Sequence, residues 1–488
     1  VPACLALALV TAAAVLVPAL AAAQPVASAL QERADRFLGL VNSIHLGVTA
    51  VEQNAAWDAA TDVTPAHDAA ADAASKARAA FGGSPALIRE ARALLEHRAG
   101  LAPVTVRQLE RVLLNAAEGP MTDPELVRAR IEAETRQLSI MNSFAFTLDG
   151  RPISPNEMDE RLETLSDLTA RRAVWEASKQ SGPALRAGLE ELQGLRNRVA
   201  RELGYPDYFA LKVAGHDMTT DEMVRMNEEF LRVLEPLYRQ LHTWAKHELA
   251  KRYGQSVPKR IPAHWIPNRW SQEWNALVAS ASLDSAFASR DPAWVVRTAE
   301  GFWLGLGMEP IPESFWARSD LYPVPPGGTR KKNSHAYSWH MDLERDIRSL
   351  MSVQANERWF GTAHHELGHG HYSLCTVRPE VPPLLRNGAS PSFDEAMATL
   401  GELAAQQAGY LESLGLQPER RRRDEITPLL RQALADIPFM FWASGVMTHW
   451  EADLYARGLP PGEWNARWWR YVADYQGVEP PAPRGEEF

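Results

Sequence analysis

Hydrophobic residues recur every three or four positions along most of the chain, which is the spacing of one face of an α-helix. The clearest run extends over Met223–Tyr253 and stops at Gly254, a residue type that favours the end of a helix. Six further runs share this spacing: Ser28–Ala50, Glu125–Met141, Ser166–Leu203, Pro292–Leu306, Glu395–Leu411 and Arg423–Tyr455. The pattern predicts an all-α, mainly helical fold.

Alternation of apolar and polar residues, which is typical of strands, is confined to two stretches. Ser143–Leu148 and Ser334–Val353 predict a minor element of short strands. The segment Tyr322–Thr329 is rich in proline and glycine and predicts a surface loop. Since neither an internal repeat nor a low-complexity linker divides the chain, we expect one large domain over residues 24–488.

Composition narrows the classes of partner. The chain has 488 residues, of which 45% are hydrophobic, and a net charge of −10. An acidic protein without a basic patch is a poor match for nucleic acid or an anionic membrane, so we expect neither as a partner. Only Cys4 and Cys375 occur, and we expect no disulfide and a buried, unreactive Cys375.

The first residues predict a targeting segment. Leu5–Ala23 is apolar and ends in three alanines before Gln24, so we interpret residues 1–23 as a signal peptide. A membrane anchor is disfavoured by Pro18 and by the lack of a basic cluster after the run. Residue 1 is Val and no basic residue precedes the run, so we expect the recorded sequence to begin after the true start. The signal peptide predicts export, and together with the abundance of alanine and arginine it favours a bacterial protein that is periplasmic or secreted.

The strongest chemical signal is His365-Glu366-Leu367-Gly368-His369. Residues four apart lie on the same face of a helix, so both imidazoles can point at one zinc ion while Glu366 reaches a water beside it. Three protein ligands and one open position make such a zinc site catalytic. A helix that carries two histidines by coincidence is the alternative interpretation.

A third ligand is needed, and Glu395 is the best candidate. It lies 26 positions after His369, at the start of another apolar helical run. Asp394 is the second choice, because an adjacent residue on a helix points in a different direction. Without the histidine motif, Glu395 would be read equally well as a first-turn acid that complements the helix dipole.

Two longer stretches carry a family resemblance. His364–His369 and Leu385–Ala396 together resemble the angiotensin-converting enzyme family of zinc peptidyl-dipeptidases. Further segments agree in order: Asn54–Trp57, Ala200–Tyr205, Ile261–His264, Ser334–Trp339, Tyr475–Gly477 and Pro480–Arg484. The resemblance runs from about residue 28 to the last residue.

The resemblance implies a zincin-type metallopeptidase with a deep central cleft between helical halves. It implies zinc held by His365, His369 and Glu395, Glu366 as general base, and release of C-terminal dipeptides from oligopeptides. We expect a monomer without stable membrane association. The match also implies that His335 donates to a substrate carbonyl and that Ala336 pairs with the substrate backbone.

At other positions the match to the family pattern is weaker. Gln272, between two tryptophans, matches a glutamine that contacts the substrate's terminal carboxylate. By the residues alone, Gln272 is a surface amide and His335 an ordinary strand histidine. Thr399 replaces an aspartate that supports a zinc ligand in the family, and Glu402 is a substitute. The segment that should bind chloride matches poorly, which leaves Arg201 as the chloride candidate.

The family continues beyond the Pro480–Arg484 segment, whereas this sequence ends at Phe488. In the family the later stretch carries residues that stabilise the tetrahedral intermediate and hold the substrate's terminal carboxylate. We therefore expect an incomplete domain in which the zinc site forms but turnover is severely reduced. Two alternatives remain open: a zinc carboxypeptidase or oligopeptidase of another helical family, and a catalytically impaired zinc- or peptide-binding fragment.

Overall fold

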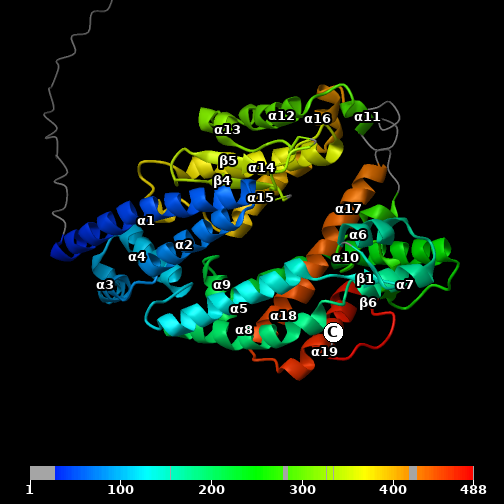
Figure 1. Ribbon diagram of the computed structural model, residues 1–488, viewed down its shortest axis with the longest axis horizontal. Coiled ribbons are helices and arrows are strands. Elements are labelled where there is room, and N and C mark those ends of the chain that lie inside the picture. Colours follow the sequence, from blue (N-terminus) through cyan, green and yellow to red (C-terminus); the bar gives the residue numbers. More distant parts are fainter. Residues whose placement is uncertain are drawn as a thin grey trace, which may run out of the picture.

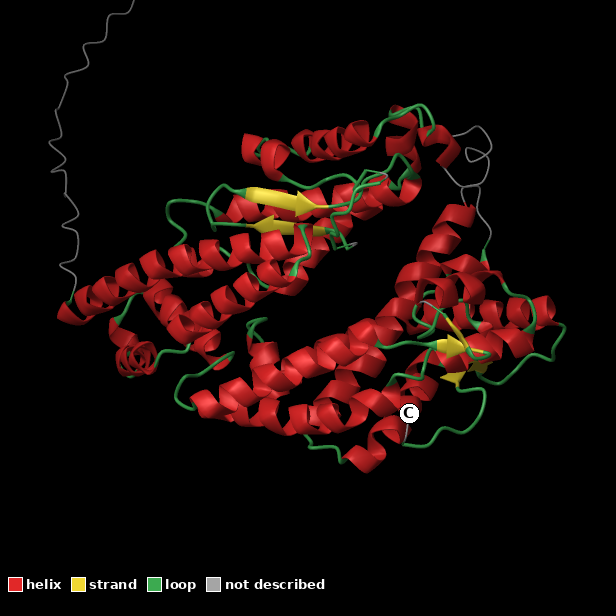
Figure 2. Ribbon diagram, viewed as in Figure 1, coloured by secondary structure: helices red, strands yellow, loops and turns green. Residues whose placement is uncertain are grey.

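A computed structural model describes residues 28–153, 155–278, 284–325, 327–333, 335–416 and 426–486. Helices dominate these ranges, and the strands within them form three two-stranded sheets (Figures 1 and 2). The prediction of an all-α, mainly helical fold with a minor short-stranded element is confirmed. The predicted signal peptide lies outside the described residues. Within them, no helix is long and apolar enough to cross a membrane.

The α-helices are α1 (Ala29–Thr61), α2 (Pro65–Gly82), α3 (Pro85–Leu95), α4 (Pro103–Ala117), α5 (Pro124–Ser143), α6 (Pro155–Thr164), α7 (Leu168–Ala177), α8 (Gly182–Glu202), α9 (Tyr208–Ala214), α10 (Thr220–Tyr253), α11 (Asp284–Phe287), α12 (Pro292–Gly305), α13 (Glu313–Arg318), α14 (Glu357–Thr376), α15 (Pro391–Ala405), α16 (Ala408–Ser413), α17 (Ile426–Met440), α18 (Thr448–Tyr455) and α19 (Trp464–Tyr471). The strands are β1 (Thr147–Leu148), β2 (Arg151–Pro152), β3 (Ile261–Pro262), β4 (Tyr337–His340), β5 (Ile347–Leu350) and β6 (Val478–Glu479). Shorter turns include the 3₁₀ segments η3 (Asn275–Leu277) and η4 (Pro383–Leu385) and the π-helical segment η6 (Phe441–Met447).

The helices fall into two groups, which Figure 1 shows one above the other. One group contains α1, α2 and α12–α16 with the β4–β5 hairpin, and the other contains α5–α10 and α17–α19. Each group has its own large core. Trp303, Phe360 and Leu367 lie in the first core, while Trp175 and Trp274 lie in the second. Because burial of apolar surface is the main stabilising contribution to folding, each group has its own source of stability.

Local signals explain where the longest helix begins and ends. The Thr219 side chain accepts a hydrogen bond from the N–H of Glu222, whose carboxylate accepts one from the N–H of Thr219, which forms a capping box. At the other end Gly254 has φ = 61°, a left-handed conformation that glycine adopts without a steric penalty. The predicted run Met223–Tyr253 is therefore one helix, α10, which begins three residues earlier.

Two predicted helical runs are each divided. Ser166–Leu203 forms α7 and α8, because the chain turns after Ala177 and Pro183 begins a new helix. Arg423–Tyr455 forms α17, η6 and α18, with its first three residues outside the described ranges. The predicted strand Ser143–Leu148 is also shorter, because α5 continues to Ser143.

The second predicted strand region forms a hairpin beside α14. Strands β4 and β5 pair antiparallel, with Tyr337 opposite Leu350. Strand β5 is buried throughout, whereas the second edge of β4 pairs with no other strand among the described residues. An unpaired edge leaves backbone N–H and C=O groups available to an extended peptide.

The cysteine prediction is wrong. Cys375 is exposed in the last turn of α14, with its sulfur 3.9 Å from the sulfur of Met308. The surrounding apolar pattern suggested burial, but the buried face of α14 in that turn is occupied by Leu374.

Candidate metal centre

Helix α14 carries the two histidines and is fixed at both its start and its buried face. The Asn356 side chain accepts a hydrogen bond from the N–H of Trp359 at 2.9 Å, which caps the first turn. Phe360, Ala363 and Leu367 recur at helical spacing and are fully or almost fully buried in the core with Trp303. The opposite side of the helix is thereby turned towards α15.

Helix α15 begins at the sequence Ser390-Pro391. The Ser390 hydroxyl accepts from the N–H of Phe393 at 3.2 Å, and proline occupies the first helical position. This start places Asp394 in the first turn and Glu395 directly after it, and both face the two histidines of α14.

Glycine allows α14 and α15 to pack closely. A Cβ atom on Gly368 would lie 2.8 Å from the Cα of Ala398 in α15 and 2.8 Å from Cζ2 of Trp303. The Trp303 indole N–H donates to the carbonyl of His364 at 3.0 Å, which attaches α12 to the same turn of α14. The distance between the two helices is therefore set by backbone contact and by one buried tryptophan.

His365, His369 and Glu395 converge on one point. Their candidate ligand atoms all lie within 4.8 Å of one another. The two Nε2 atoms are 3.2 Å apart, and the Glu395 carboxylate is 3.5 Å from Nε2 of His365 and 3.9 Å from Nε2 of His369. Tetrahedral zinc with Zn–N bonds of about 2.0–2.1 Å separates its nitrogen ligands by roughly 3.3 Å. This donor set therefore fits zinc.

Acidic side chains contact the other ring nitrogens of the histidines. Asp394 Oδ1 lies 2.8 Å from Nδ1 of His369, and Glu402 Oε2 lies 3.5 Å from Nδ1 of His365. A carboxylate at Nδ1 favours the tautomer with a free Nε2, which is the form that binds a metal. Burial alone lowers the pKa of His369, but the hydrogen bond and charge of Asp394 outweigh it and the pKa is raised. Asp394 thus lies behind a ligand rather than within the ligand cluster.

Glu366 is held between the histidines on the same helix. Its side chain is buried, with the residue only 6% exposed. Burial raises the pKa of Glu366 to about 7, against the opposing charges of His365 and His369. A buried carboxylate whose pKa lies near neutrality can both accept and return a proton.

Comparison with known proteins agrees with this geometry. The sequence profile of the peptidase M2 family, described as angiotensin-converting enzyme, matches residues 28–488. The chain belongs to the angiotensin-converting enzyme family. The family resemblance expected from the motifs is confirmed.

Individual members of the angiotensin-converting enzyme family are moderately similar to this chain. The enzyme of Bos taurus is 29% identical over 332 residues, that of Mesocricetus auratus 30% over 322, and that of Theromyzon tessulatum 26% over 353. These alignments cover 64%, 62% and 69% of this chain. They span 25%, 24% and 56% of the length of these three relatives, so the chain matches only part of each.

The substrate candidates from the family match belong to the two different groups of elements. His335 and Ala336 directly precede β4, and the charge of His335 lowers the pKa of Glu366, which places the two side chains near each other. Gln272 belongs to the second group of helices. Its N–H donates to Asn268 Oδ1 at 3.3 Å, and within the described part of the chain Gln272 makes no hydrogen bond or ion pair with the metal cluster.

A large cavity lies between α14 and α15 of the first group and α17 of the second. Its volume is about 1260 Å³, and it is lined by α14 and α15 on one side and by α17 and η3 on the other. Glu402 lines it from α15, and Glu273, next to Gln272, lines it from the opposite side. The cavity therefore extends from the neighbourhood of the metal cluster towards the second group of helices.

The chloride candidate stands apart from this site. Arg201 is exposed in the last turn of α8, where its Nε donates to the carbonyl of Pro206 at 3.0 Å. The structure brings it to none of the other predicted site residues.

Asp394 and Trp303 position the metal-binding helices and side chains, a role that the sequence did not predict for either residue. A carboxylate one residue before a ligand was the available signal for Asp394, whereas nothing in the sequence indicated Trp303.

Proposed function

We propose that this protein is a zinc peptidase that hydrolyses oligopeptides and releases C-terminal dipeptides. The observation that carries the proposal is the convergence of His365, His369 and Glu395 beside the buried carboxylate of Glu366. The family membership supports the same reaction, since the chain matches the angiotensin-converting enzyme profile over residues 28–488.

The zinc ion and the Glu366 carboxylate have different roles in the proposed reaction. Zinc bound by His365, His369 and Glu395 supplies a Lewis acid for the scissile carbonyl and lowers the pKa of water. Glu366 accepts the proton of the attacking water and then donates it to the leaving amine, so that the carboxylate is regenerated. Asp394 and Glu402 hold the histidine rings in the orientation that faces the cluster.

The hairpin beside α14 supports binding of an extended substrate. An unpaired strand edge can pair with a peptide backbone and leave the side chains of the peptide free. Ala336, directly before β4, takes the pairing role, and His335 donates to a substrate carbonyl. The cavity of about 1260 Å³ has room for the side chains on one side of the bond, with Gln272 assigned to the terminal carboxylate.

The setting of the enzyme is proposed on sequence grounds. The apolar segment Leu5–Ala23 with its terminal alanines supports export through a signal peptide. We propose a monomer that acts on peptides in the periplasm or outside the cell.

Glu366→Gln tests the assignment of the base. Gln has almost the same size but cannot accept a proton, so we expect turnover to be lost while zinc affinity stays within about threefold of the wild type. Zinc content is measured by atomic absorption after dialysis, and hydrolysis by mass spectrometry of an N-terminally blocked oligopeptide. His365→Ala is the matched comparison, since it should lose both zinc and turnover. Appreciable activity in the glutamine variant would show that another group is the base.

The products separate the proposed reaction from its rivals. A time course should show the loss of two residues at a time from the C-terminus, whereas a carboxypeptidase removes one and an oligopeptidase cuts internally. The 488-residue chain is assayed beside a version extended to the next stop codon in its reading frame. Zinc binding without hydrolysis in both versions would contradict the peptidase assignment and favour a binding role.

A further inference from the structure

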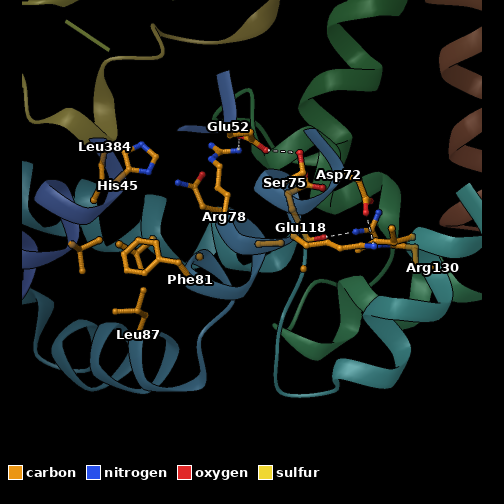
Figure 3. A pocket seen from close by; sticks show the side chains of 18 residues that line it. His45, Glu52, Asp72, Ser75, Arg78, Phe81, Leu87, Glu118, Arg130 and Leu384 are labelled. Atoms are coloured by element: carbon orange, nitrogen blue, oxygen red, sulfur yellow. Dashed lines mark hydrogen bonds and ion pairs between the residues drawn. The ribbon is translucent and has the colours of Figure 1, made fainter. Parts of the chain in front are cut away.

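A second cavity lies far along the chain from the metal ligands, among the N-terminal helices. Its volume is about 360 Å³, and α1, α2, α3, α4 and α5 line it together with η4. Figure 3 shows His45 at one end beside Leu384, with Phe81 and Leu87 below. Val41 and Val112 complete the apolar part of the wall. The volume is within the range of about 300–1,000 Å³ that small-molecule sites occupy.

One polar group in this apolar part lacks a partner. His45 is only 5% exposed, and its Nε2 makes no hydrogen bond to any described residue. Leaving a buried polar group unpaired costs about 1–3 kcal/mol, so such groups are rare without a ligand or an ordered water. Burial, assisted by the charge of Arg78, lowers the pKa of His45 to about 4. The ring is therefore neutral at pH 7, with one nitrogen donating and one accepting.

Each charged side chain in the wall of the cavity forms an ion pair. Lys76 pairs with Asp72 at 2.7 Å, and Arg78 pairs with Glu52 at 3.1 Å. The remaining two lining charges have partners outside the cavity: Arg130 pairs with Glu134 at 2.6 Å and Glu118 with Lys212 at 2.9 Å. A charged ligand would have to break one of these pairs or remain unpaired beside them, so a neutral ligand is favoured.

We propose that this cavity binds a small neutral molecule with an aromatic or aliphatic body and one hydroxyl or N–H group, such as a phenol or an indole. The body packs against Val41, Phe81 and Leu87, and the polar group hydrogen-bonds to the ring of His45. Small-molecule sites combine apolar walls with a few polar groups that fix the orientation of the ligand, and the apolar end of this cavity offers one buried, unpaired ring nitrogen.

The site is separate from the metal centre but is connected to it by the chain. Leu384 of η4 lies between His369 and Glu395 in the sequence, and its N–H donates to Asn42 Oδ1 of α1 at 2.9 Å. One wall of the cavity therefore belongs to the segment that joins the two metal-binding helices. The binding proposal itself does not depend on peptidase activity.

The test uses two probes of similar shape, p-cresol and toluene, and calorimetric titration of the whole chain. We expect p-cresol to bind at one site and to bind about three- to tenfold more tightly than toluene, the gain from one neutral hydrogen bond. His45→Leu should weaken p-cresol binding by the same factor and leave toluene binding unchanged. His97→Leu, which alters an exposed histidine of the same region, should change neither.

Further controls locate the binding. Leu87→Trp should fill the apolar end and abolish binding of both probes, and removal of zinc by chelation should leave binding intact. Three results would overturn the proposal: neither probe binds at millimolar concentration, His45→Leu binds p-cresol as the wild type does, or binding disappears with the metal. The comparison of the two probes on the wild type keeps the test decisive even if a variant fails to fold.

Discussion

Replacing Gly368 by alanine tests whether the contact between α14 and α15 sets the metal site. The new Cβ would lie 2.8 Å from the Cα of Ala398 and 2.8 Å from Cζ2 of Trp303. Neither neighbour can move alone, because the first is helix backbone and the second is an indole that is 1% exposed and hydrogen-bonded to His364. The two helices must therefore separate.

The size of the separation follows from the same contact. Ordinary van der Waals contact of a Cβ begins at 3.4 Å, so the helices must move apart by about 3.4 − 2.8 = 0.6 Å. Metal–ligand distances tolerate only about ±0.2 Å, and Glu395 is the ligand that moves with α15. Overpacking of this kind costs about 1–3 kcal/mol. The metal-free protein relieves part of that cost by relaxing, whereas bound zinc prevents the relaxation. We expect zinc affinity to fall at least tenfold, which corresponds to about 1.4 kcal/mol.

The assay is competition for zinc against a chromogenic chelator, combined with melting of the metal-free protein. Gly301→Ala is the matched control, since Gly301 lies inside α12 and a Cβ there meets nothing within 4 Å. Both variants gain the same helix propensity, about 1 kcal/mol, so their difference isolates the steric effect. If Gly368→Ala binds zinc within twofold of the control, the helix spacing does not determine the site and the reasoning is refuted.

Two further predictions concern charge and pH. Asp394→Ala should weaken zinc binding about 10- to 100-fold, because it removes the carboxylate 2.8 Å from His369 Nδ1. Zinc affinity is measured by competition with a chelator, and Ser392→Ala, a change in the same helical turn, is the control. Equal affinities of the two variants would contradict the prediction. His264, 9% exposed, has its pKa lowered from 6.5 to about 4 by burial and then by Arg171. Below pH 6.5 the unfolded state therefore binds more protons than the folded state, and stability falls as the pH drops towards 4, by about 2 kcal/mol at pH 5. Between pH 7 and 5 the melting temperature of His264→Gln should decrease less than that of the wild type, and parallel decreases would disprove the assignment.

The sequence predicted the metal ligands better than the residues that hold those ligands in position. The spacing of His365 and His369 fixes their common face, because helix geometry is local. Glu395 could be chosen only beside the histidine motif, since a glutamate at the start of a helix otherwise has an ordinary explanation. Asp394 was ranked as the second-choice ligand because an adjacent residue on a helix points in a different direction, but where that direction leads depends on how α15 crosses α14. That crossing is determined by Gly368 and Trp303, which lie in different parts of the sequence.

The same distinction holds for the fold. Continuous periodicity predicted helices correctly, but it could not locate the break between α7 and α8 or the π-helical turn η6. Both features preserve the apolar face while changing the path of the backbone, so the hydrophobic pattern contains little trace of them. The prediction that Cys375 is buried failed for a related reason, because a residue at the edge of the apolar face of a helix can be either buried or exposed.

The hydrogen bond between Asn42 and Leu384 implies an order of events during biosynthesis. The two residues are 342 positions apart, so the helix that supports the metal-binding segment leaves the ribosome long before that segment is made. At about 5–20 residues per second this interval lasts on the order of tens of seconds. During this interval the N-terminal helices lack Leu384, which forms part of the wall of the cavity beside His45. The zinc ligands, at positions 365, 369 and 395, are also made late, so the complete metal site can form only after most of the chain has been synthesised.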